Sequence, residues 1–296
     1  MVQAGKPSPL ELHALSRPRP IVVGYLEGPA GTNALQAAAA EARLRGAPLS
    51  VVHKLVGTEA PEVFASAESA EEHRRTVMAR VLAVAHDVAP DLEQVDARVT
   101  TAPIAEELIV ASRTALLLVL GVTTNHATTA ALLDTVPREV VRHAHCPVLL
   151  VPPTSPAQPP NRLVCGLDRS TSSIDALHWA AKEADLRGIT VLAVEVRPAT
   201  RDGRTPDPEE VSLSNWVRMH LPSASTTVVC SSETGPAGRR LLEIATEHNA
   251  MLVVGSHRPG RRLGRSVVRT VTSQSKVPVV VVPHAEPIRN REELPR

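Results

Sequence analysis

Short apolar runs alternate along the chain with longer segments in which apolar and polar residues mix at helical spacing. Runs such as 116–120 (LLLVL) and 148–151 (VLLV) are typical of strands that are buried on both faces of a parallel sheet. The alanine-rich segment 33–45 favours a helix, which Gly46 would end. Strands that alternate with helices in this way predict an α/β fold, in which helices cover both faces of a parallel sheet.

The whole pattern of strands and helices is repeated once. The segment EARLRG at 41–46 returns as EADLRG at 183–188, at an offset of 142 residues, and CPV at 146–148 returns as VPV at 277–279, at an offset of 131. Each copy predicts the order β-α-β-α-β-α-β-α-β, and hence two tandem five-stranded domains. We expect these parts: a flexible N-terminal arm over 1–18, a first domain over 19–152, a proline-rich linker over 153–161, a second domain over 162–283 and a C-terminal tail over 284–296.

Composition narrows the class of protein. Hydrophobic residues make up 43% of the chain but aromatic residues only 1%, so the core must be built from Val, Leu, Ala and Ile. The net charge of +1 gives no overall attraction to nucleic acid or membranes. The three widely spaced cysteines adjoin apolar runs and indicate a reducing compartment. With no apolar run of membrane-spanning length and no apolar signal segment, we expect a soluble cytoplasmic protein without a membrane partner.

A basic loop follows the apolar strand at 251–254. No Asp or Glu occurs between Glu247 and Glu286, and the cations in that interval are Arg258, Arg261, Arg262, Arg265, Arg269 and Lys276. A helix that starts near Ser266 would point its free backbone N–H groups at this loop. Such N–H groups, together with a hydroxyl and arginines, suit a phosphate. The alternative is a solvated basic loop without a ligand.

Longer segments of both halves resemble a known family. These segments are IVVG…EARLRGAPLSVVH and VPREVVRHAHCPVLLV in the first half, and LVCGLDRSTSSIDALHWAAKEADLRG and VVGS…GRSVVRTVTSQSKVPVVVV in the second. The chain resembles a tandem, two-domain universal stress protein of the actinobacterial type. The resemblance implies Rossmann-like domains of the adenine-nucleotide-binding type. It also implies a nucleotide pattern, namely an Asp after the first strand and Gly-x2-Gly-x9-Gly-Ser/Thr after the fourth, in which the glycines let the backbone approach the phosphates.

The first half departs from this pattern. Leu26 stands at the Asp position, and Thr124 and Asp134 replace the second and third glycines, so that only Gly121 and Thr135 match. A carboxylate beside a phosphate is repulsive, and no Lys or Arg lies between 121 and 136 to offset it. We therefore expect no nucleotide in the first domain.

The second half keeps more of the pattern, although its loop is three residues shorter. Arg258 and Arg265 stand at glycine positions, and Gly260 and Gly264 could serve in a shifted register. We expect ATP or another adenine nucleotide here. The candidate binding residues are Asp168, Gly255, Ser256, His257, Arg258, Gly264, Arg265 and Ser266.

Three of these residues also have a simpler interpretation. Arg258 could fill the pocket itself, and His257 could be an exposed loop histidine. Asp168 could cap the following helix together with Ser170 and Ser172.

The last strand of each half is wholly apolar, and such an edge invites aggregation unless another strand pairs with it. In the family that the chain resembles, these strands pair across a two-fold axis. We therefore predict an intramolecular pseudo-dimer through Val148–Val151 and Val279–Val282, and leave further homodimerisation open.

The leading functional hypothesis is a non-enzymatic stress-response protein that binds adenine nucleotide in its second half and acts on an unidentified regulatory partner. The alternative is a ligand-free dimerisation or scaffold protein with both sites degenerate. An ATP pyrophosphatase or nucleotidyl transferase would need an SGGxDS or HIGH-type loop, which is missing. The sequence has no HxxxH, HExxH, CxxC or G-x-S-x-G motif, so we predict neither a metal site nor catalytic residues. Nucleic-acid binding ranks low because the basic stretch 258–276 lacks aromatic residues.

Overall fold

The computed structural model describes residues 18–55, 67–122, 135–153, 159–198, 212–221, 225–256 and 264–284. Nearly all of the expected N-terminal arm, residues 154–158 of the expected linker, and the expected tail after His284 lie outside this range.

Both halves have the element order that the repeat predicts. The first half contains β1 (Ile21–Tyr25), α2 (Pro29–Arg45), β2 (Leu49–Lys54), α3 (Ala67–Val88), β3 (Val95–Thr100), α4 (Ile104–Ala111), β4 (Leu117–Gly121), α6 (Thr135–His143) and β5 (Val148–Val151). The second contains β6 (Arg162–Leu167), α7 (Thr171–Arg187), β7 (Thr190–Arg197), α8 (Leu213–His220), β8 (Val228–Thr234), α9 (Ala237–Glu247), β9 (Met251–Gly255), α10 (Gly264–Gln274) and β10 (Val279–Val282).

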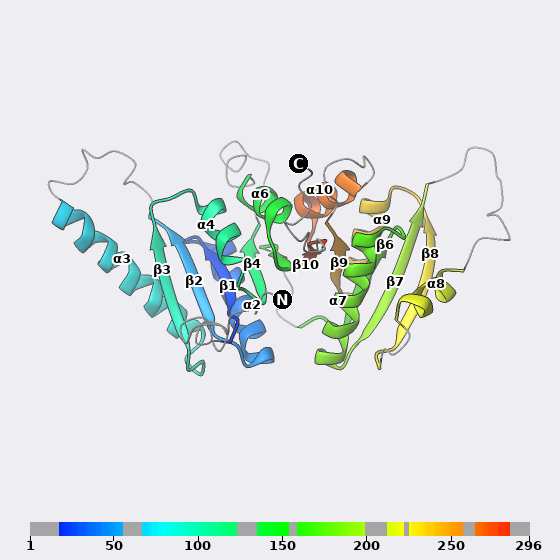
Figure 1. Ribbon diagram of the computed structural model, residues 1–296, viewed down its shortest axis with the longest axis horizontal. Helices are drawn as coiled ribbons and strands as arrows, with labels where there is room; N and C mark the ends of the chain where they lie inside the picture. Colours follow the sequence, from blue (N-terminus) through cyan, green and yellow to red (C-terminus); the bar gives the residue numbers. More distant parts are fainter. Residues whose placement is uncertain are drawn as a thin grey trace, which may run out of the picture.

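The strands form one continuous ten-stranded sheet in the order β3-β2-β1-β4-β5-β10-β9-β6-β7-β8 (Figure 1). Within each half the strands are parallel, and the halves join through the antiparallel pair β5–β10, in which Val280 lies opposite Leu149. The predicted pairing of the two last strands within one chain is confirmed. Because both strands are paired on each side, neither apolar edge is bare.

Helices cover both faces of the sheet, as the alternation of strands and helices predicts. Alternate strand residues enter two separate cores; for example, Val119 belongs to one and its neighbour Leu118 to the other. One core lies under α2, α3, α7 and α8, and the other under α4, α6, α9 and α10. Both cores are almost wholly aliphatic, and Trp216, which is 8% exposed, is the only buried Trp, Tyr or Phe in the described ranges.

Two helices begin earlier than their sequence patterns indicate. Helix α2 starts at Pro29, four residues before Asn33, because proline suits the first turn, where its missing N–H is not needed. Helix α10 starts at Gly264, two residues before Ser266. Gly264 and Arg265 therefore belong to the first turn of a helix and not to the loop in which we expected them.

A buried cluster of four charges joins the C-terminal ends of α2 and α7. Arg45 and Arg187 each contact both Glu41 and Glu183; the Arg45–Glu183 ion pair is 2.5 Å long and the Arg187–Glu183 pair 2.6 Å. Glu41 is 5% exposed and Glu183 4%. Burial opposes the charge of Arg187, but the two carboxylates outweigh it and raise its pKa. Each half supplies one Glu-x3-Arg pair, so the cluster exists only when the halves are docked.

Candidate functional site

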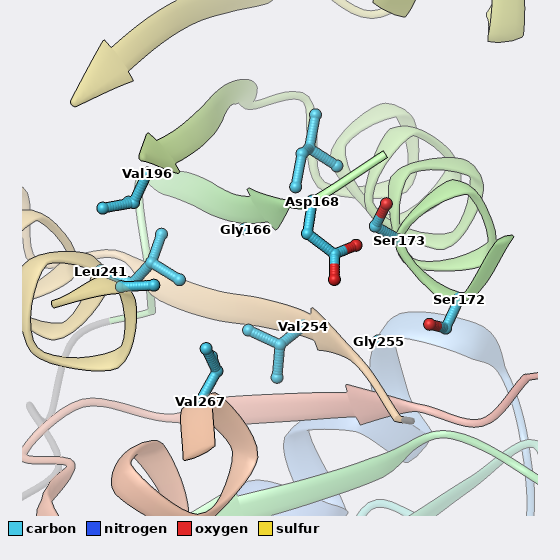
Figure 2. Close-up of a pocket in the computed structure, with 11 residues that line it drawn as sticks. Gly166, Asp168, Ser172, Ser173, Val196, Leu241, Val254, Gly255 and Val267 are labelled. Carbon is cyan, nitrogen blue, oxygen red and sulfur yellow. The ribbon is translucent and has the colours of Figure 1, made fainter. Parts of the chain in front are cut away.

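A pocket of about 70 Å³ opens at the carboxyl ends of β6 and β9 (Figure 2). Strand β6 has β9 on one side and β7 on the other, so this is the point where the strand order reverses, which is where open α/β sheets bind ligands. Asp168, Ser172 and Ser173 supply polar groups to the wall, and Leu241, Val254 and Val267 supply apolar ones (Figure 2). The arrangement suits a small, partly apolar ligand with hydroxyl or amine groups.

Asp168 lies in the turn between β6 and α7. Its Oδ1 accepts hydrogen bonds from the backbone N–H of Ser170, at 3.1 Å, and from the Ser170 hydroxyl. Ser170 is the N-cap of α7, since its Oγ accepts the backbone N–H of Ser173. The simpler interpretation of Asp168 is thus partly right: Ser170 caps the helix, and Asp168 holds the capping residue.

The residue next to Asp168 has an unusual backbone. Arg169 adopts φ 59, a left-handed conformation that costs an L-residue about 1–2 kcal/mol. Its guanidinium donates two hydrogen bonds to Glu195 on β7, at 2.7 and 3.2 Å, and Arg197 donates to the same carboxylate. Burial raises the pKa of Glu195, but the hydrogen bonds from the two arginines outweigh it and hold the pKa below its ordinary value. This ion cluster holds the turn that presents Asp168.

Gly255 lines the pocket, yet packing alone requires a glycine there. A Cβ at this position would lie 2.2 Å from the backbone oxygen of Ser172 in α7. At the matching position in the first half, a Cβ on Gly121 would lie 2.4 Å from the backbone oxygen of Ala30. Since the close approach of strand and helix occurs in both halves, Gly255 does not by itself indicate a phosphate.

The other candidate residues do not all meet at the pocket. The Ser256 N–H donates to Val282 at 2.8 Å, and its hydroxyl accepts the N–H of His284 at 3.3 Å; Ser256 does not line the pocket. His257 and Arg258 lie outside the described residues, and Gly264, Arg265 and Ser266 are placed only as backbone in the first turn of α10.

Apolar residues of the pocket wall escaped the sequence analysis. Leu241, Val254 and Val267 look like ordinary core positions, because nothing in their spacing marks the side that faces a cavity. Ser172 was considered only as part of a helix cap, and Ser173 was not considered. Their place in the first turn after the Asp168 loop was the one signal that could have marked them.

The corresponding turn of the first half lacks these polar groups. Leu26 replaces Asp168 and is 44% exposed, and Ala30 and Gly31 replace Ser172 and Ser173. Glu27, which replaces Arg169, pairs with Arg80 on α3 at 2.7 Å. The three positions that match Asp168, Ser172 and Ser173 therefore carry no carboxylate or hydroxyl in the first half.

The described part of the chain has neither a cluster of metal ligands nor a membrane-spanning helix. It holds no group of three or more His, Cys, Asp or Glu residues that could bind a metal ion. None of the helices described there combines the length and apolarity needed to cross a membrane. Cys146 and Cys165 are buried, and burial raises the pKa of each thiol to about 12, whereas Cys230 is half-buried.

The fold and the pocket define a duplicated α/β protein with a small pocket at a topological switch point. The family model described as "Universal stress protein family" matches residues 18–152 and 160–283, and the chain belongs to this family, as its motifs predicted.

One curated relative and two solved structures show the range of similarity. Universal stress protein Rv1996 of Mycobacterium tuberculosis is 30% identical, over 88% of this chain and 94% of the relative. The crystal structure of a universal stress protein from Archaeoglobus fulgidus DSM 4304 covers 90% of this chain and 98% of its own, with 16% identity and a TM-score of 0.67. A universal stress protein from Archaeoglobus fulgidus, solved in complex with dAMP, covers 45% of this chain and 96% of its own, with 22% identity and a TM-score of 0.31.

Proposed function

We propose that the second half, residues 162–283, binds an adenine nucleotide such as ATP, and that the first half, residues 19–152, does not. The observation that carries the proposal is the pocket at β6 and β9, where Asp168 and two serine hydroxyls lie at the strand-order reversal. In the first half Leu26, Ala30 and Gly31 occupy the same places. A carboxylate suits the hydroxyls of a ribose, and the apolar wall suits a base.

Only part of a nucleotide would enter this pocket. Ligand pockets usually measure roughly 300–1,000 Å³, whereas this one measures about 70 Å³. We therefore place the base or ribose in it and the phosphates beyond the strand ends. This placement agrees with the expectation that Arg258, Arg265 and Ser266 serve the phosphates, which stays a prediction.

The proposed role of nucleotide binding is regulatory and non-enzymatic. A cytoplasmic chain of this kind would change its affinity for a partner protein when the nucleotide binds. The second candidate function is a ligand-free scaffold, and a specific observation favours it: β5–β10 pairing and the buried charge cluster join the halves through contacts of the chain itself.

Calorimetry and native mass spectrometry with ATP, ADP, AMP and cyclic AMP test the proposal. Val267→Phe replaces a small side chain of the pocket wall by a bulky aromatic ring. Val136→Phe makes the same change at the half-buried matching position of the first half. We expect one nucleotide per chain, an affinity at least about tenfold weaker in Val267→Phe because the pocket is filled, and no change in Val136→Phe.

A second pair of variants probes the carboxylate. Asp168→Asn keeps an acceptor for Ser170 but removes the charge, and we expect about tenfold weaker binding because a charged hydrogen bond is lost. Leu26→Asn is its counterpart in the first half and should change nothing. If no nucleotide binds at millimolar concentration, the scaffold function stands instead; if Val136→Phe abolishes binding, the ligand occupies the other half.

A further inference from the structure

A second, larger hollow lies between the two halves. It is a groove of about 610 Å³ on the sheet face that α7 covers, whereas Leu241, Val254 and Val267 place the pocket at β6 and β9 on the opposite face. The first half contributes the residues just before β5, including His145, and the second half contributes α7 and the end of β10. The two hollows share no lining residue. The volume of the groove falls within the usual range for small-molecule sites, roughly 300–1,000 Å³.

Basic side chains line this groove, and its one carboxylate is already engaged. Lys182 is exposed and has no ion pair within the described ranges. His145 also lines the groove, and its ring makes no hydrogen bond to any of the described residues. Asp175 accepts a hydrogen bond of 2.6 Å from Nδ1 of His284, so its charge is directed at that imidazole. The groove therefore presents Lys182 and imidazoles to a ligand, without a competing free carboxylate.

An aromatic ring lies beside Lys182. Trp179 is half-buried, packs partly on the core under α7, and lines the groove. Lys182 follows it by three residues on the same helix, so the two side chains project from one face. Nε2 of His178 donates to the backbone oxygen of His220 at 2.8 Å, which fixes the orientation of that imidazole. A flat apolar surface beside a cation matches a flat ligand with an anionic group.

The duplication supplies an internal comparison. On α2 the positions that match Asp175, His178, Trp179 and Lys182 are Asn33, Gln36, Ala37 and Ala40. In each matched pair the two side chains are alike, either both half-buried or both exposed. The helix thus packs on its sheet equally well with alanine in place of Trp179 and Lys182. Packing alone does not account for the tryptophan, the lysine and the imidazoles on α7.

We propose that this groove binds a small aromatic anion, with its ring on Trp179 and its charged group at Lys182 and His145. The proposal does not depend on nucleotide binding at β6 and β9. The site needs both halves, because His145 comes from the first and Trp179 from the second.

Tryptophan fluorescence tests the chemistry of the ligand. The chain has two tryptophans, and Trp216→Phe leaves Trp179 as the only one. In that background we expect benzoate to quench the emission saturably at millimolar concentration. Benzamide lacks the charge and cyclohexanecarboxylate lacks the aromatic ring; each should bind at least about fivefold more weakly, because one of the two contacts is lost. Equal effects of all three compounds, or no saturable quenching, would overturn the proposal.

Ligand-observed NMR with benzoate on the full chain tests the location. The triple variant His178→Gln, Trp179→Ala, Lys182→Ala gives α7 the residues of α2, which the same fold already accepts. We expect its benzoate affinity to fall at least about tenfold, since stacking and charge are both removed. Lys276→Ala removes an exposed cation at the position that matches His145 and should leave the affinity unchanged.

Two further outcomes would contradict the location. Full binding by the triple variant would place benzoate elsewhere on the chain. Loss of benzoate binding in Val267→Phe, or its displacement by AMP, would place benzoate in the pocket at β6 and β9. The proposal is supported only when Val267→Phe binds benzoate normally and the triple variant does not.

Discussion

The turn after β1 and the turn after β6 have the same place in the fold but carry opposite chemistry. In the first half, Glu27 reaches α3 to pair with Arg80, and Leu26 is half-exposed. In the second, Arg169 takes a strained backbone conformation and pairs with Glu195 on the neighbouring strand. The next strand differs as well: His53 on β2 occupies the place of Glu195, and its Nδ1 donates a hydrogen bond to the Tyr25 carbonyl oxygen, 3.1 Å away.

This comparison separates what the fold needs from what a ligand would need. Features present in both halves, such as the glycines at 121 and 255, serve packing. Features present in one half, such as Asp168 with Ser172 and Ser173, are not required to build the domain. Within a duplicated chain, the asymmetric residues are therefore the better guide to binding. The predictions below test this division from the largest expected effect to the smallest.

The largest effect should come from the charge cluster, which belongs to both halves at once. Glu41→Gln leaves two buried arginines with one carboxylate, and we expect a loss of about 3 kcal/mol in the free energy of unfolding. Glu183→Gln should cost the same, because its environment is equivalent. Urea titration measures both.

Two further variants test whether the loss of stability comes from leaving a buried charge without a partner. Arg43 lies on α2, as Glu41 does, and forms an exposed ion pair with Asp91. Asp91→Asn breaks this pair and should hardly change the urea midpoint. Replacing all four residues of the cluster by Met should restore most of the stability, because no buried charge is then left without a partner. If Glu41→Gln behaves like Asp91→Asn, the cluster does not hold the halves together.

The two strand-end glycines should be equally intolerant of a side chain. Gly121→Ala and Gly255→Ala each bring a Cβ against a backbone oxygen of the facing helix, and we expect each to lose about 1–3 kcal/mol of stability. Thermal unfolding of the two variants measures this loss. If Gly255→Ala is as stable as the native chain and loses only nucleotide affinity, Gly255 serves ligand binding and not packing.

Glu195 should make the second half sensitive to acid. Its folded pKa lies below its ordinary value of 4.5, so its stabilising effect is fully present above that value and is lost as the pH falls through the lower folded pKa. Glu195→Gln should therefore lower the free energy of unfolding at pH 7 by about 1–2 kcal/mol. This difference between the variant and the native chain should shrink as the pH falls. Unfolding curves from pH 7 to pH 3 give the gap directly; a gap that is constant over this range contradicts the ion cluster.

The smallest effect is expected in the first half. Leu26→Asp restores the carboxylate that the family pattern has after the first strand, but Ala30 and Gly31 still supply no hydroxyl. We expect no second nucleotide by calorimetry and a stability change within about 0.5 kcal/mol, because the side chain is exposed. A second bound nucleotide would show that the missing carboxylate at position 26 is what keeps the first half from binding nucleotide.

The sequence alone determined the class of fold, the duplication and the pairing of the last strands. These follow from local rules: apolar runs, helical spacing, proline and glycine positions, and the hazard of a bare apolar edge. The nucleotide pattern of the family that the chain resembles put Asp168 and Gly255 at one site, and both line the pocket at β6 and β9. The domain bounds and the phosphate-binding role of residues 256–266 stay predictions.

The tertiary structure decided what those residues do. Gly255 is needed for the close contact with α7, and Ser170 caps that helix. Leu241, Val254 and Val267 form the apolar wall of a pocket. The charge cluster arises between the halves, from residues 138 and 146 positions apart, and the groove beside Trp179 also takes its lining from both halves. No local pattern shows that contact, because it depends on how two complete domains dock through β5 and β10.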